Sequence, residues 1–101
     1  MGKLHIITPV KDSLVTTLKT IDGIMDSEIS SGFSYYIYDD FSTEETTQRL
    51  NQKSLESGFE HIKLSDITTH PSPNYLLVLQ LAQQKAIADK AHLIIIESDV
   101  V

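Results

Sequence analysis

Apolar and polar residues alternate along this chain in blocks that predict strands and helices in regular succession. Short runs rich in β-branched and aromatic residues predict four strands, at 3–8, 33–38, 59–64 and 92–97. Apolar residues at helical spacing lie between these runs and predict three helices, at about 13–25, 43–55 and 75–89. The order is therefore β-α-β-α-β-α-β, with each later strand entered from a helix.

This order predicts a Rossmann-like α/β fold, in which an open parallel sheet has right-handed crossovers and helices on both faces. The last run contains four consecutive apolar residues, which is typical of a strand buried on both faces, so we expect it in the middle of the sheet. The third run is shorter and less apolar, and we expect it at an edge. Pro9 is expected to end the first strand, because proline cannot donate a hydrogen bond to a strand ladder.

Local signals set the expected ends of the helices. Ser42 and Glu45 form the Ser-x-x-Glu pattern of a capping box, which predicts a helix directly after an acid pair, and Gly58 is expected to end that helix. Residues 65–74 are polar and interrupted by proline, so they predict a long irregular loop. In the helix that follows, Leu76 and Leu77 are expected in the core.

Composition narrows the function without identifying it. The chain has 101 residues, which suits one domain, and no cysteine, which excludes a disulfide framework and thiolate chemistry. Its net charge is −6 and its eight Lys and Arg residues are scattered, which argues against a nucleic-acid partner. No apolar run approaches membrane-spanning length and the start lacks the apolar core of a signal peptide, so we expect a cytoplasmic location, including the inner face of the cell membrane.

Polar and acidic residues follow three of the four predicted strands. They are Thr8-Pro9-Val10, Asp39-Asp40, and the pair Glu97 and Asp99. Because ligands of open parallel sheets bind at the carboxyl ends of the strands, we expect these residues to gather at one functional edge. The chain has no glycine-rich phosphate loop, so this acidic edge would bind a phosphate group through a bridging divalent cation.

Three motifs at these strand ends carry a family resemblance. They read ITPVKDS, YDDFSTEET and IIIESDV. Over its whole length the chain resembles the amino-terminal, nucleotide-binding half of a GT-A fold glycosyltransferase of the family 2 type. That family has a Pro-Val/Tyr-Asn turn after its first strand, Asp-Asp-Gly-Ser after its second and Asp-x-Asp after a later one. The middle motif is the most specific, because the acid pair and the capped helix occur together.

The resemblance implies roles for five residues at the first two strand ends. Thr8, Pro9 and Val10 would line the pocket for the base and ribose. Asp40 would accept a hydrogen bond from the base, typically from uracil N3–H. Asp39 would be structural or would make a second contact.

At the last strand end, the resemblance implies that Glu97 lies near the ribose and that Asp99 binds the divalent metal, Mn²⁺ or Mg²⁺. The implied partners are a nucleotide-sugar donor, most commonly a UDP-sugar, and an acceptor saccharide or lipid-linked sugar. In the family, the acceptor site and the catalytic base come from sequence after Asp-x-Asp, so the catalytic residues are expected beyond Val101. We therefore expect residues 1–101 to be the donor half, inactive by itself, with oligomerisation through the surface that the other half would cover.

The sequence departs from the family pattern at four places. Phe41 replaces the usual Gly, Asp12 stands where Asn is common, and Glu97 replaces an Asp. The Arg-Asn-x-Gly segment before the last helix is missing, with Asn74 near the place of its basic residue.

Two other functions agree with the same pattern. One is a receiver-type phospho-acceptor domain, although receivers have their acid pair after the first strand and this chain has it after the second. The other is a non-catalytic α/β interaction module, in which the acids only stabilise a helix N-terminus. The four histidines lack the spacing of zinc ligands, and the tyrosines of the second strand are expected in the core.

Overall fold

The computed structural model describes residues 3–12, 14–26, 33–71 and 73–97 of the chain. The elements in chain order are β1 (Lys3–Val10), α1 (Leu14–Met25), β2 (Phe33–Asp39), α2 (Glu44–Ser57), β3 (Glu60–Lys63), the 3₁₀ helix η1 (Leu64–Asp66), α3 (Tyr75–Ala88) and β4 (Ala91–Ile95). All pairings are parallel and the strand order is β3-β2-β1-β4. The expected Rossmann-like α/β arrangement with an open parallel sheet is confirmed.

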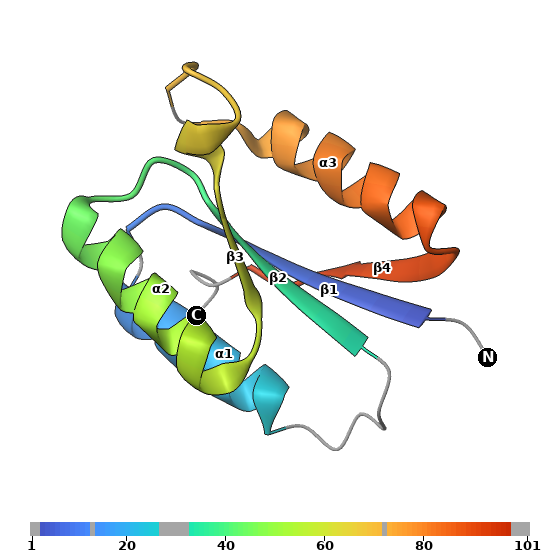
Figure 1. Ribbon diagram of the computed structural model, residues 1–101, viewed down its shortest axis with the longest axis horizontal. Coiled ribbons are helices and arrows are strands. Elements are labelled where there is room, and N and C mark those ends of the chain that lie inside the picture. The colour runs from blue at the N-terminus through green and yellow to red at the C-terminus, as the bar shows by residue number, and fades with distance from the viewer. Residues whose placement is uncertain (1–2, 13, 27–32, 72, 98–101) are drawn as a thin grey trace.

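The sheet separates two helical layers, with α1 and α2 on one face and α3 on the other (Figure 1). Side chains alternate between these layers along each strand. In β1, Ile6 packs in the core beneath α1 and α2, whereas Ile7 packs beneath α3. In β2, Ile37 and Tyr38 divide between the layers in the same way. The central strands thus have apolar residues on both faces because each face is covered by a helix.

β1 continues past its expected end, because Pro9 removes no hydrogen bond from the sheet. Ile7 O accepts a bond from Ile96 N–H at 2.9 Å, and Val10 O accepts one from Asp40 N–H at 2.8 Å. Main-chain groups alternate in direction along a strand, so position 9 points to the β4 side, where the pairing with β4 ends at Ile7. A proline can occupy such a position without loss of a ladder bond. The prediction that Pro9 ends the strand was therefore wrong.

β4 lies at an edge of the sheet, so the prediction that it is central was wrong. Among the described residues it pairs with β1 alone. Helix α3 packs on one face of β4, but Ile94 and Ile95 stay 43% and 38% exposed. Hydrophobicity reports how much apolar surface a strand offers, whereas its neighbours depend on the path of the whole chain. The prediction that the third strand is an edge is confirmed for β3.

The start of α2 differs from the expected capping box by one residue. Thr43 is the N-cap, and its hydroxyl accepts a bond from Thr46 N–H at 3.5 Å. The hydroxyl of Ser42 instead accepts a bond from Asp12 N–H at 2.9 Å, which joins the loops after β1 and β2. Gly58 ends the helix as predicted, with φ of 85°, a conformation that glycine adopts without steric cost.

Helix α3 has apolar residues around most of its circumference, but only one stripe faces the sheet. The buried residues are Val78, Ala82 and Ala86, at successive intervals of four. Leu77 is half-buried, whereas Leu76 is 73% exposed, so the expectation that Leu76 is a core residue was wrong. With so many apolar positions, the sequence pattern does not specify which stripe meets the sheet.

Two tyrosines of β2 are buried on opposite faces of the sheet, as expected for core residues. The Tyr35 hydroxyl forms a 2.7 Å hydrogen bond with Thr8 Oγ1. The Tyr38 hydroxyl has no hydrogen-bond partner among the described residues. Burial raises the pKa of each phenol to about 12, so both are neutral at physiological pH.

We predict opposite effects for the two hydroxyl deletions. Tyr38→Phe removes an unpaired polar atom from the core and should raise the free energy of unfolding by up to about 1 kcal/mol, or leave it unchanged. Tyr35→Phe leaves the buried Thr8 hydroxyl without its partner and should lower it by about 1 kcal/mol. Urea unfolding of both variants measures the difference. A loss in Tyr38→Phe as large as that in Tyr35→Phe would contradict this account.

Candidate functional site

The parallel sheet brings the predicted site residues to one edge. Val10 and Asp39 are register partners at the carboxyl ends of β1 and β2. Glu97, which is exposed, follows β4 beside the same end of β1. The chain reverses its direction of strand addition between β1 and β4, which is where open α/β sheets bind ligands.

Two predictions for the last strand end lie outside the described residues. Asp99, the predicted metal ligand, is one of them. Val101, beyond which the catalytic residues were expected, is the other. The structure therefore tests neither the metal ligand nor the position of the catalytic base, and both stay predictions.

The side chains at the end of β1 are largely taken up by packing. Thr8 and Val10 are buried, at 0% and 2% exposure, and Val10 belongs to the core beneath α1 and α2. Pro9 is half-buried and points to the opposite face. A ligand at this edge would therefore meet the Pro9 ring and main-chain groups rather than the Thr8 and Val10 side chains. Their role in nucleotide binding stays a prediction.

Asp39 joins three elements beneath the α2 layer. Its carboxylate accepts hydrogen bonds from His61 Nε2 at 3.0 Å, Thr47 Oγ1 at 2.7 Å and Ser42 N–H at 3.1 Å. The side chains of Asp39 and His61 are only 2% and 3% exposed. Burial by itself would raise the pKa of Asp39, but the bonds from His61, Thr47 and Ser42 outweigh it and hold the pKa below its usual value. This geometry gives Asp39 a structural role between β2, α2 and β3.

Asp40 points to the other layer, because adjacent side chains of a strand face opposite ways. Its Oδ2 accepts a bond from Asn74 N–H at 2.8 Å, and its Oδ1 accepts one from Asn74 Nδ2 at 2.9 Å. Both residues are buried, and Asn74 directly precedes α3. The carboxylate thus lies at the positive end of the α3 dipole and fixes the start of that helix. A nucleotide base that donates to Asp40 would share the carboxylate with Asn74.

The loops after β1 and β2 each contain a non-glycine residue in the left-handed conformation, Asp12 with φ of 61° and Phe41 with φ of 59°. Asp12 Oδ1 accepts a bond from Thr43 N–H, which is the main cause that lowers the pKa of Asp12. Phe41 occupies the place of the glycine in the family motif and packs, half-buried, against the core beneath α3. The left-handed conformation costs a residue with a Cβ about 1–2 kcal/mol, so burial of the ring has to offset it. Residues in such conformations are concentrated at functional sites.

The cavity nearest to this edge is small and lies on the β3 side of β2. Its volume is about 120 Å³, and it is lined by Asp39, Phe41, Ser42, Thr47, Lys63 and Ser65. Typical small-molecule pockets measure roughly 300–1,000 Å³. This cavity therefore does not by itself accommodate a nucleotide.

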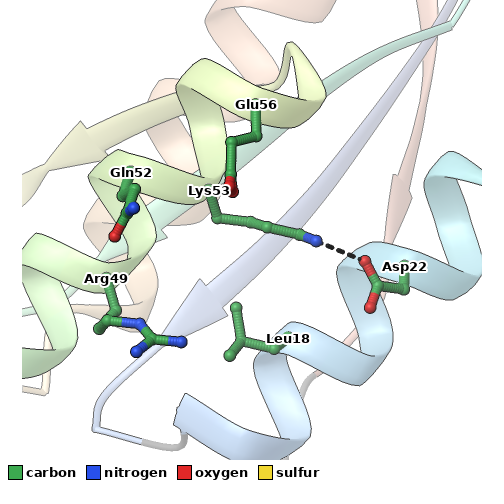
Figure 2. Close-up of a pocket in the computed structure, with 6 residues that line it drawn as sticks. All are labelled: Leu18, Asp22, Arg49, Gln52, Lys53 and Glu56. Carbon is green, nitrogen blue, oxygen red and sulfur yellow. Dashed lines mark ion pairs between the residues drawn. The ribbon is translucent and has the colours of Figure 1, made fainter.

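A second hollow lies between α1 and α2, over the middle of the helices rather than at the strand ends (Figure 2). It measures about 270 Å³ and is lined by Leu18, Asp22, Arg49, Gln52, Lys53 and Glu56. Lys53 Nζ bridges the two helices to Asp22 Oδ1 at 2.7 Å (Figure 2). Charges of both signs line this hollow, and none of the predicted site residues lines it.

The described residues do not form a metal site by themselves. Within 3–12, 14–26, 33–71 and 73–97, no three Asp, Glu or His side chains converge on a common point. The carboxylates of Asp39 and Asp40 are engaged by His61 and Asn74. In the same part of the chain, no helix has the length and hydrophobicity to cross a membrane.

Comparisons with known proteins assign no relative. No protein-family model matches the chain, and no curated protein or solved structure matches it significantly.

Three residues of this edge, His61, Thr47 and Asn74, were not among the predicted site residues. His61 and Asp39 are 22 positions apart, and Asn74 and Asp40 are 34 apart, so no local pattern marks these pairs. A signal was present only for Asn74, because asparagine directly before a predicted helix is a common cap. Here its side chain bonds to Asp40 and makes no cap bond to α3.

We predict that Asp39→Asn lowers the free energy of unfolding at pH 7 by about 3–5 kcal/mol, because it breaks a buried ion pair. Since the folded pKa of Asp39 is lowered, its contribution is present above the unfolded value of 3.8 and is lost as the pH falls through the folded value. Urea unfolding between pH 7 and pH 2 should show the gap between wild type and variant closing only below about pH 4. Asp66→Asn, at an exposed acid whose ion pair with Lys63 measures 4.0 Å, is the control and should change stability by under about 1 kcal/mol. An equal effect of both substitutions would refute the prediction.

We also predict that Asn74→Ala lowers the free energy of unfolding by about 1.5–3 kcal/mol, because Asp40 loses a charge-assisted hydrogen bond from Nδ2. Amide hydrogen exchange should be faster in the first turn of α3, whose entry Asn74 fixes. The matched control is His70→Ala, which removes a 3.2 Å contact of an exposed residue with Asn74 Oδ1 and should have little effect. Unchanged exchange in Asn74→Ala would show that this contact does not anchor α3.

Proposed function

We propose that this chain is the nucleotide-sugar-binding part of a cytoplasmic glycosyltransferase, which transfers a hexosyl group from a UDP-type nucleotide sugar to an acceptor hydroxyl. The observation that carries the proposal is the strand order β3-β2-β1-β4, which places Asp39 and Asp40 beside the end of β1 and next to the reversal between β1 and β4. The three strand-end motifs supply the chemistry of the family resemblance at this same edge.

The described residues suggest how a nucleotide would be held. Asp40 is fixed in direction by Asn74 and is the acceptor proposed for uracil N3–H. The Pro9 ring lies on the same face of the sheet as Asp40 and offers an apolar surface to the base. Glu97 is exposed at the neighbouring strand end, where the ribose is proposed to lie. Metal binding is proposed for Asp99 from the sequence motif alone, and no step of the reaction is assigned to it.

The strand order argues against a receiver-type domain. In the flavodoxin-like order 2-1-3-4-5, β1 lies between β2 and β3. Here β1 lies between β2 and β4, and β3 lies beyond β2. The dinucleotide-type order, which begins 3-2-1-4, agrees with the proposed function instead.

Isothermal titration calorimetry with UDP, in the presence and absence of Mn²⁺, tests the proposal. We predict binding that depends on Mn²⁺ and is weakened at least ~10-fold in Asp40→Asn and in Asp99→Asn, since each loses one charge-assisted contact, typically about 1.5–3 kcal/mol. The control is Asp26→Asn, which removes the same charge from an exposed residue after the end of α1, at the opposite edge of the sheet. Circular dichroism confirms that each variant is folded. Absence of UDP binding by the folded wild-type protein would overturn the proposed function.

A further inference from the structure

The two edges of the sheet differ in how they are protected from other strands. β3 has four residues and begins and ends with the exposed charged residues Glu60 and Lys63. Short length and charge are common means by which proteins protect an edge strand. β4 has five residues and continues through Ile96 to Glu97, and it contains no Lys, Pro, Asp or Glu between Ala91 and Ile96. Its unprotected, apolar edge is typical of a strand that pairs with another strand.

The main chain of β4 has a defined set of outward groups. Ile96 N–H donates to Ile7 O of β1, so positions 96, 94 and 92 point inward. By alternation, the N–H and C=O groups of Leu93, Ile95 and Glu97 point away from β1. Among the described residues no strand pairs with this outer side. A partner strand would therefore bond to Leu93 and Ile95.

The sequence of β4 is complementary to itself in the antiparallel direction. Lys90 and His92, both exposed, lie at its start, and Glu97 lies at its end. Antiparallel pairing of two copies brings the basic start of one strand near the acidic end of the other, whereas parallel pairing would bring like ends together. Opposite charges across neighbouring strands stabilise a sheet and like charges destabilise it.

Apolar matching selects one register. A two-fold axis perpendicular to the sheet must pass through one residue position, since residues directly opposite each other share a face. With the axis at Ile94, Ile94 is opposite its own copy and Leu93 is opposite Ile95. With the axis at Ile95, Leu93 would be opposite Glu97, an apolar residue against a charge. With the axis at Leu93, the acids Asp89 and Glu97 would oppose each other. Only the first register matches apolar residues at the centre and uses the outward groups of Leu93 and Ile95 for hydrogen bonds.

We propose that two copies of this chain associate through their β4 strands, antiparallel about a two-fold axis at Ile94, into one continuous sheet. The pairing supplies hydrogen bonds to the outer edge of β4 and covers the exposed side chains of Ile94 and Ile95. This inference does not depend on the proposed function.

Cysteine cross-linking tests the register directly, because the chain contains no cysteine of its own. At the two-fold axis, Ile94 and its copy form a non-hydrogen-bonded pair with Cα atoms about 4.5 Å apart, which a disulfide can span. We predict that oxidised Ile94→Cys forms a covalent dimer in high yield. In Ile95→Cys the two positions are offset by two residues, about 8 Å apart, and should cross-link at least ~10-fold more slowly. Faster cross-linking at Ile95 than at Ile94 would overturn the register.

Analytical ultracentrifugation tests the association itself. The wild-type chain should sediment at twice its monomer mass of 11.3 kDa. Ile94→Lys places two like charges opposite each other and should raise the dissociation constant at least ~100-fold. The control is Ile87→Lys, at a position that is 69% exposed on α3, which should leave the dimer intact.

A wild-type protein that is monomeric at all concentrations would overturn the proposal. Slow hydrogen exchange of the Ile95 amide in such a monomer would assign the β4 edge to another segment of the same chain. Charge reversal gives an independent readout: Glu97→Lys should weaken the dimer, and addition of Lys90→Glu should restore it. Failure of the double variant to recover would contradict the antiparallel direction.

Discussion

Two adjacent carboxylates at the end of β2 connect the sheet to both of its helical layers. Because neighbouring side chains of a strand point to opposite faces, Asp39 reaches the layer of α2 and Asp40 reaches the start of α3. Each buried charge is satisfied by several hydrogen bonds, which is the condition under which a carboxylate can be buried without a large penalty. The positions of α2, β3 and α3 around the functional edge all depend on this dipeptide.

This arrangement has a consequence for ligand binding. Asp39 is fully used by His61, Thr47 and Ser42, so its charge stabilises the fold. The Asp40 carboxylate is held by Asn74 through a main-chain and a side-chain bond. The same contact that orients the Asp40 carboxylate also occupies part of its accepting capacity. A ligand at this edge is thereby coupled to the entry of α3.

The edges of the sheet show the contrast between a strand adapted to solvent and one that is not. β3 is short and bounded by charges, whereas β4 is continuous, apolar and exposed at Ile94 and Ile95. The helices account for this difference. α1 and α2 follow β1 and β2 and lie together on one face, while α3 alone lies on the other (Figure 1). The hydrophobicity of β4 therefore exceeds what this arrangement of helices covers.

The sequence by itself determined the order of elements, the parallel α/β class, the glycine that ends α2 and the meeting of the acidic strand ends at one edge. These follow from local periodicity, turn chemistry and the geometry of parallel crossovers. The tertiary structure decided that β4 is an edge, that β1 passes through Pro9, and that Asp40 bonds to Asn74. Each of these depends on contacts between residues far apart in the chain, such as the Ile96–Ile7 bond and the 34-residue separation of Asp40 and Asn74. Local pattern carries no record of such neighbours, because a side chain's hydrophobicity or charge states what it needs and not which distant residue supplies it.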